Sequence, residues 1–237
     1  MLQGQPHRSL SDMVQNLLLL GSFLVELVLL YLISRQTTKE LFTFFRKFFS
    51  DSIVFVLITL IFLPGTIIHE LAHYFMAIIL FLNVREISVL PEFQKNYIKL
   101  GKVVYEKKDI VRGILVGIAP IFAGLFIFWL LSLVKIFPNS NIFITIGLSY
   151  LIFVISTTMF SSKQDLVDIA FIIPILLCIG AIIFIFNINL AGFLEKTHFW
   201  TSFNHFIQQL NFYFLLSFAI HIILIIVLKS IHKLWHR

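Results

Sequence analysis

The stretch that decides the fold is 53-IVFVLITLIFLPGTIIHELAHYFMAIILFL-82, a long apolar run. A helix needs about 20 apolar residues to cross the hydrocarbon core of a bilayer, so this run can span a membrane with residues to spare. Because Pro64-Gly65 interrupts it, we expect the helix to break or kink there and a new helix to begin near Thr66, which is a suitable N-cap. Within this apolar setting stand His69, Glu70 and His73.

Composition supports a membrane protein. The chain has 237 residues, of which 59% are hydrophobic and 13% charged. Soluble domains average about 45–50% apolar and about 25% charged residues, so one water-soluble core could not bury this much apolar surface. The net charge is +6, but no glycine-rich phosphate loop or aromatic nucleic-acid box accompanies it, and we expect no nucleic-acid partner. Cys178 is the single cysteine, which excludes an internal disulfide and a multi-cysteine zinc site.

The apolar runs predict an all-α polytopic membrane protein with about six transmembrane helices and a small cytoplasmic β-hairpin insertion. We treat residues 1–237 as a single domain with its core at 53–186. The predicted spans are residues 14–34, 53–82, 110–136, 142–160, 166–186 and 210–229.

Two connecting segments have a distinct character. Residues 35–52 place Phe and Leu beside basic residues, which is typical of a helix lying in the membrane interface. The polar segment at about 84–108 contains the β-like runs "VREISVL" and "KLGKVVYE", separated by the turn-prone "PEFQKN". This pattern predicts a hairpin or pair of strands at the membrane surface.

Lysine and arginine predict the orientation. With six spans, one face of the membrane holds 12 of the 18 basic residues, including those at both chain ends and in the insertion. Basic residues concentrate in cytoplasmic loops, so we expect both termini in the cytoplasm. The polar N-terminal sequence does not resemble a cleaved signal peptide. The compact chain favours a prokaryotic plasma membrane.

The sequence 69-HELAH-73 carries the candidate chemistry. Positions i and i+4 project from one face of a helix, so the imidazoles of His69 and His73 can bind one ion. This is the HExxH arrangement, in which zinc lowers the pKa of a bound water and the glutamate, here Glu70, takes its proton. Ionisable side chains are costly inside a bilayer, which favours this interpretation over a polar helix-packing cluster.

A two-histidine zinc site needs a third protein ligand. In "SSKQDLVD", Asp165 lies at the turn between the fourth and fifth predicted spans, on the same side of the membrane as the histidines. We therefore favour Asp165 as the third ligand of one Zn²⁺ ion, with helix capping as its alternative role. Asp168 follows one helical turn later and is expected to act as a packing or second-shell residue, although it remains the alternative ligand.

These features resemble the site-2 protease family of intramembrane zinc metalloproteases. Residues 53–170 carry the resemblance: "HELAH", the β insertion, "GILVGIAPIFAG" and "SSKQD". The resemblance implies an aspartate ligand at the start of a later helix and a kinked, small-faced helix near the site, which places Gly117 and Pro120 behind the ligands. Asp165 is followed by Leu-Val-Asp rather than by the "LDG" motif of many members, and no PDZ domain interrupts the chain.

The expected activity is zinc-dependent endoproteolysis of membrane-embedded protein substrates, with Glu70 as general base. The insertion would offer a strand edge to an unwound substrate. A non-catalytic zinc-binding membrane protein that holds membrane partners is the alternative. Glu26 is a further candidate because it lies near the middle of the first span, where His221 could be its partner. The substrate and the oligomeric state stay open.

Overall fold

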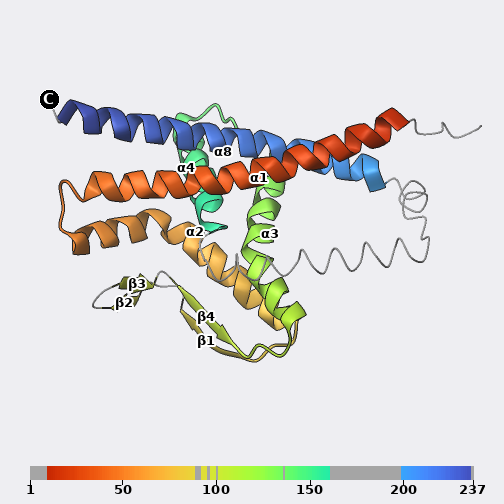
Figure 1. Ribbon diagram of the computed structural model, residues 1–237, viewed down its shortest axis with the longest axis horizontal. Helices are drawn as coiled ribbons and strands as arrows, with labels where there is room; N and C mark the ends of the chain where they lie inside the picture. The colour runs from red at the N-terminus through yellow and green to blue at the C-terminus, as the bar shows by residue number, and fades with distance from the viewer. Residues whose placement is uncertain are drawn as a thin grey trace, which may run out of the picture.

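The computed structural model contains five helices and four short strands in the part of the chain that it describes (Figure 1). The described residues are 10–88, 92–94, 97–99, 101–135, 137–160 and 199–235. The helices are α1 (Leu10–Phe45), α2 (Asp51–Ile79), α3 (Ile110–Val134), α4 (Ile142–Thr158) and α8 (Phe199–Trp235). The strands are β1 (Val84–Ser88), β2 (Glu92–Gln94), β3 (Tyr97–Lys99) and β4 (Lys102–Tyr105).

Helix α2 runs through Pro64 without ending, which corrects the predicted break. Thr66 is not an N-cap, because its hydroxyl donates to the carbonyl of Phe62 at 3.1 Å, a bond made inside a continuing helix. In an apolar setting a broken helix would leave several backbone groups without partners, whereas one proline removes a single N–H donor. Continuity is therefore the less costly outcome, and the histidines lie on the same continuous helix as residues 51–63, which changes direction along its length (Figure 1).

Helix α1 is also longer than predicted, and it includes most of the segment expected to form a separate interfacial helix. Several of its polar side chains bond within the helix: the hydroxyls of Thr37 and Thr38 each donate to the carbonyl four residues earlier, at 2.9 Å. The Gln36 amide donates to the carboxylate of Glu40 at 2.6 Å. Because these groups need no water, the helix continues to Phe45.

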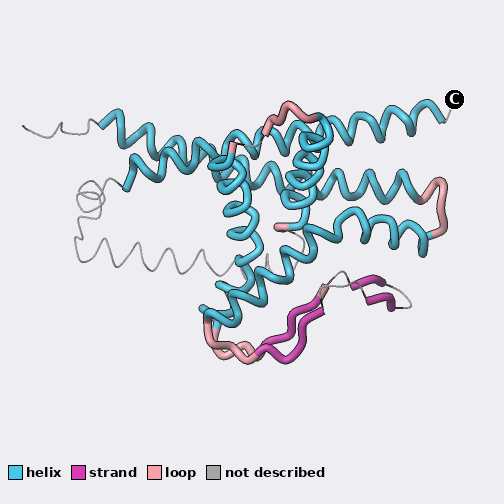
Figure 2. Tube along the Cα trace, turned by 180° about the vertical axis from the view of Figure 1, so that it is seen from behind, coloured by secondary structure: helices cyan, strands magenta, loops and turns pink. Residues whose placement is uncertain are grey.

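Helices α1 and α8 lie side by side and run in the same direction (Figures 1 and 2). The rings of Phe23 and Phe214 stack with centroids 5.4 Å apart. Further along both helices the Glu40 carboxylate lies 3.6 Å from the Lys229 ammonium. Helices α3 and α4 cross this pair steeply, and α2 packs against both α3 and α4.

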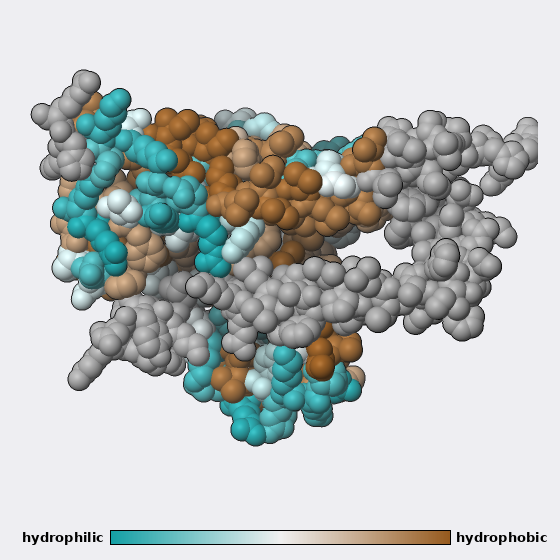
Figure 3. All heavy atoms as spheres, viewed as in Figure 1, coloured by the Kyte–Doolittle hydropathy of each residue, from teal (hydrophilic) through white to brown (hydrophobic). Residues whose placement is uncertain are grey.

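Four described helices are long and apolar enough to cross a bilayer. They are Leu18–Phe45, Asp51–Ile79, Ile110–Val134 and Ser202–Leu234. Helix α4, predicted as a span at 142–160, is apolar but shorter, with 17 residues. The predicted span 166–186 lies outside the described residues. The chain is thus a helical membrane protein, while the described part does not provide six spans. Apolar residues cover the middle of the helices, and hydrophilic residues gather over β1 and β4 and where α1 meets α2 (Figure 3).

The parallel pair bears on the predicted orientation. Two parallel helices that both cross a bilayer begin on one face and end on the other. Lys229 and Lys233 of α8 then lie on the same face as Lys39 of α1 and Lys47, whereas the six-span prediction places the two groups on opposite faces. The basic residues no longer favour one face clearly, and the structure gives no support to the prediction that both chain ends are cytoplasmic.

The polar insertion forms small antiparallel ladders, as predicted. Strand β1 pairs with β4 in the register Ile87 with Val103, and the register shifts between Val84 and Glu86. The "PEFQKN" segment is more than a turn, because its residues Glu92–Gln94 form β2, which pairs with β3. The Arg85 guanidinium donates to the Glu106 carboxylate and holds the pKa of that carboxyl below its usual value.

The fully buried His221 joins three helices. Its Nδ1 lies 2.9 Å from the hydroxyl oxygen of Thr37 on α1, and its Nε2 lies 3.1 Å from that of Ser156 on α4. These contacts correct the suggested pairing of His221 with Glu26. The Glu26 Oε2 atom is buried and has no hydrogen-bond partner among the described residues.

Gly65 sets the distance between α2 and α4. A Cβ atom added there would overlap the side chains of Thr158 and Val154 on α4. We expect Gly65→Ala to lower the free energy of unfolding by about 1–3 kcal/mol, because overpacking outweighs the gain of about 0.5–1 kcal/mol that alanine usually brings to a helix. The measurement is reversible unfolding of the purified chain in detergent. Gly147→Ala is the control, since a Cβ there meets nothing within 4 Å; equal effects of the two substitutions would refute this packing argument.

Candidate metal centre

The three titratable residues of the 69-HELAH-73 segment of α2 are all buried. His69 is 4%, Glu70 9% and His73 8% exposed. They lie toward the C-terminal end of a helix whose other buried side chains are mostly apolar. Buried ionisable groups without partners or ligands cost several kcal/mol, so their accumulation within five residues needs compensation by contacts or by a bound ion.

Helix α3 orients the second histidine. The Nδ1 atom of His73 lies 2.8 Å from the carbonyl oxygen of Val116. Because a carbonyl only accepts, Nδ1 must carry the proton and donate it, which leaves the Nε2 lone pair directed at the opposite side of the ring. Histidine ligands of metals are usually held in this way by a carbonyl or a carboxylate.

The two histidines converge. The Nε2 atoms of His69 and His73 are 3.1 Å apart, and the ring planes are nearly perpendicular, at 84°. Two nitrogens bound to one tetrahedral zinc at about 2.0–2.1 Å would be separated by about 3.3 Å. A shift of a few tenths of an ångström therefore suffices for both Nε2 atoms to bind one ion. The donor set fits a zinc site.

Glu70 lies against the β insertion rather than with the imidazole pair. A Cβ atom on Gly101 would overlap the Glu70 side chain from Cγ to the carboxylate oxygen. The missing side chain at Gly101, which immediately precedes β4, thus allows the polypeptide to cover Glu70 closely. This contact places the carboxylate between α2 and the β insertion.

Helix α3 buries Gly113, Gly117, Pro120 and Gly124. A Cβ atom on Gly124 would overlap the side chain of Met159, so this glycine allows α3 to approach the C-terminal end of α4 closely. Pro120 and Gly124 line a small recess that also includes His69, and Gly117 follows the residue whose carbonyl contacts His73. The structure therefore brings both residues suggested by the resemblance, Gly117 and Pro120, to the back of the histidine pair.

Both candidates for the third ligand, Asp165 and Asp168, lie outside the described residues, in the segment 161–198. Among the residues that the structure describes, no group of three His, Cys, Asp or Glu side chains converges as metal ligands. The described part of the chain thus brings together two imidazole nitrogens, with the Glu70 carboxylate one residue along the helix. The assignment of Asp165 stays a prediction.

Three features of this site were not predicted: the Val116 carbonyl on His73, the contact of Gly101 with Glu70, and the shared recess at His69. The spacing of Gly113, Gly117 and Gly124 was the available signal for the first, because it marks a helix face suited to close approach. In comparisons with known proteins, no family model, no curated protein and no solved structure matches this chain.

Proposed function

We propose that this chain is a zinc-dependent intramembrane endopeptidase that cleaves membrane-embedded protein substrates. It would hold one zinc ion through His69, His73 and Asp165, with Glu70 as general base. We also propose, from the sequence alone, that the chain is similar to the site-2 protease family, that it crosses the membrane six times and that it lies in a prokaryotic plasma membrane.

The observation that carries the proposal is the convergence of the two Nε2 atoms at 3.1 Å, with His73 held in the ligand tautomer by the Val116 carbonyl. A helix-packing role would require only that the rings be buried and bonded. It would not require a carboxylic residue, Glu70, to be buried directly after His69 in the order of the HExxH motif.

When bound, zinc would polarise the scissile carbonyl and make water a nucleophile at neutral pH. His69 and His73 would fix the position of the ion through their Nε2 atoms. Glu70 would accept the proton of the attacking water and donate it to the leaving amine nitrogen as the C–N bond breaks and the C–O bond forms. The products are a carboxylate and an amine, each on one half of the substrate.

The substrate would be a transmembrane segment, because the site lies within helices that could cross the bilayer. Peptide hydrolysis needs an extended backbone, so the substrate helix must unwind locally. Gly101, which immediately precedes β4, contacts Glu70. The outer edges of β1 and β4 could pair with such a segment. Strand addition would therefore bring an unwound backbone next to the general base.

The third-ligand assignment can be tested through zinc content. We expect Asp165→Ala to reduce bound zinc to well below one ion per chain, because two histidines alone hold zinc weakly. Asp168→Ala is the matched control, since it removes a carboxylate three residues further along the sequence, and it should keep the zinc of the unsubstituted chain. The measurement is elemental analysis of the purified full chain after dialysis against a weak chelator. Loss of zinc in the Asp168 variant alone would transfer the ligand role to that residue.

A further inference from the structure

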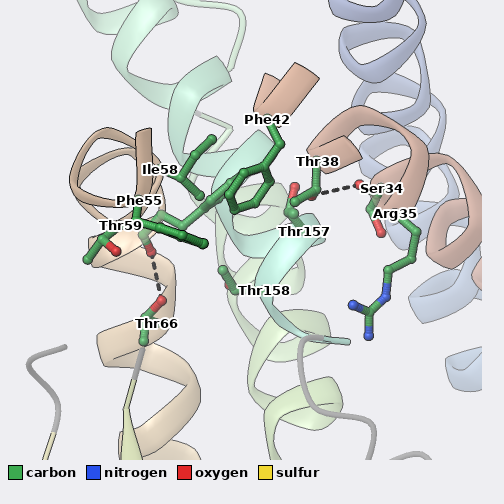
Figure 4. A pocket seen from close by; sticks show the side chains of 11 residues that line it. Ser34, Arg35, Thr38, Phe42, Phe55, Ile58, Thr59, Thr66, Thr157 and Thr158 are labelled. Carbon is green, nitrogen blue, oxygen red and sulfur yellow. Dashed lines mark hydrogen bonds between the residues drawn. The ribbon is translucent and has the colours of Figure 1, made fainter. Parts of the chain in front are cut away.

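A cavity of about 170 Å³ lies between α1, α2 and α4. We call it the α1–α2–α4 cavity. One part of its wall is aromatic, formed by Phe42, Phe55 and Phe62, and another part carries hydroxyl side chains, among them those of Thr66 and Thr158. Arg35 also lines the cavity (Figure 4), and its guanidinium donates to the carbonyl of Phe160 at 3.2 Å. The cavity is distinct from the histidine pair but uses the same helix, α2.

The hydroxyl oxygens in this wall can accept hydrogen bonds from a ligand. Thr38, Thr66 and Thr158 each donate their proton to a carbonyl of their own helix, at 2.9–3.1 Å. Their oxygen lone pairs are left to accept hydrogen bonds from whatever enters the cavity. Such a wall suits a ligand that brings N–H donors, as an unwound peptide backbone does.

The cavity adjoins the histidine pair. Thr66 precedes His69 and Glu70 by three and four residues, so it lies one turn earlier on the same face of α2. Thr158 lines both the α1–α2–α4 cavity and the recess that contains His69. A peptide bond held at the histidine pair would therefore have a neighbouring residue within reach of the cavity.

The volume fits one large apolar side chain. A cavity of about 150 Å³ lined by Leu, Ile and Phe binds benzene, so about 170 Å³ accommodates a phenyl or an isobutyl group. Ordered water is a poor fit for the aromatic part of the wall. A lipid acyl chain would leave the threonine acceptors unused, because it carries no donor.

We propose that the α1–α2–α4 cavity is a specificity subsite. It takes one large apolar side chain of the substrate, Phe or Leu, close to the scissile bond, while its threonine oxygens accept hydrogen bonds from the unwound backbone. This inference rests on the proposed endopeptidase activity. It names the substrate class as segments that carry a bulky apolar residue next to a helix-breaking stretch.

The test measures binding without cleavage. The full chain with Glu70→Gln is placed in lipid nanodiscs with either of two single-span leucine-alanine peptides, which differ only by Phe or Ala within a central glycine-flanked site. We expect the Phe peptide to bind at least about tenfold more tightly. Thr59→Phe on α2 and, independently, Thr38→Phe on α1 fill the cavity and should reduce this preference to less than about twofold, with the affinity for the Ala peptide unchanged.

Thr43→Phe is the matched control, because Thr43 is exposed on α1 and does not line the cavity. It should keep the full preference. The unchanged affinity for the Ala peptide checks that each filled variant is folded, and two variants on different helices guard against misfolding of one. Equal binding of the two peptides before any substitution, or a preference that survives both filling substitutions, would overturn the subsite.

The same peptides separate this inference from the proposed activity when they are offered to the chain with Glu70 intact. Cleavage without a preference for Phe refutes the subsite and keeps the endopeptidase. The opposite outcome is that neither peptide is cleaved, while the Phe peptide binds more tightly and the cavity-filling substitutions remove this preference. That result supports a cavity that binds a side chain and refutes the endopeptidase activity.

Discussion

Glu70→Gln is expected to reduce hydrolysis of membrane-embedded substrates by about 10²–10⁴-fold, the usual contribution of a general base. Glutamine has nearly the same shape as glutamate, so the contact with Gly101 and the buried position of the side chain should remain. Its amide cannot take a proton from water. Bound zinc should stay at the level of the unsubstituted chain, because Glu70 is not one of the three proposed ligands.

The assay uses purified chain in liposomes with a set of single-span model peptides, and it identifies products by mass spectrometry. Glu40→Gln is the control: Glu40 bonds Gln36 and lies near Lys229, away from α2's histidines, and its replacement should leave hydrolysis intact. A Glu70→Gln chain that still cleaves at the original rate would remove Glu70 from the chemistry.

His73→Ala should have the second large effect, which is loss of zinc. This substitution removes both an Nε2 donor and the hydrogen bond to the Val116 carbonyl. Loss of an outer-shell partner alone typically costs 10–100-fold in metal affinity, so we expect loss of the ligand itself to cost more than roughly 100-fold. His69→Ala should behave in the same way, because either histidine alone leaves an incomplete donor set.

The readout for the histidine variants is zinc affinity measured by competition with a chelator of known strength, which does not depend on activity. His205→Ala is the control, because His205 is exposed on α8 and should not alter zinc affinity. If His73→Ala bound zinc as tightly as the unsubstituted chain, the convergence of the two imidazoles would have no role in metal binding.

Much of the architecture follows from local sequence signals. The bounds of α3 and α4 lie within a few residues of the apolar runs that predict them, since Asp109 and Asn141 cap them by accepting from backbone N–H groups. The strands β1 and β4 likewise match the alternating runs on either side of "PEFQKN". The spacing of His69 and His73 was sufficient to predict that their rings share one face, because helix periodicity alone determines it.

The misplaced features depended on tertiary context. Pro64 and Thr66 carry local signals for a break, but the apolar surroundings favour an uninterrupted helix. The parallel pairing of α1 and α8 depends on long-range contacts such as that of Thr37 with His221, which no local pattern encodes. The cavity next to the histidine pair depends on three helices meeting, so sequence periodicity could not predict it.

The central claim is that α2 contributes two histidine ligands to a zinc ion. X-ray absorption at the zinc edge of the purified full chain tests it most directly. The account predicts a four-coordinate shell of nitrogen and oxygen at about 2.0–2.2 Å, with the outer-shell signature of two imidazoles and no sulfur. A sulfur scatterer at about 2.3 Å, or a shell without imidazole, would contradict it.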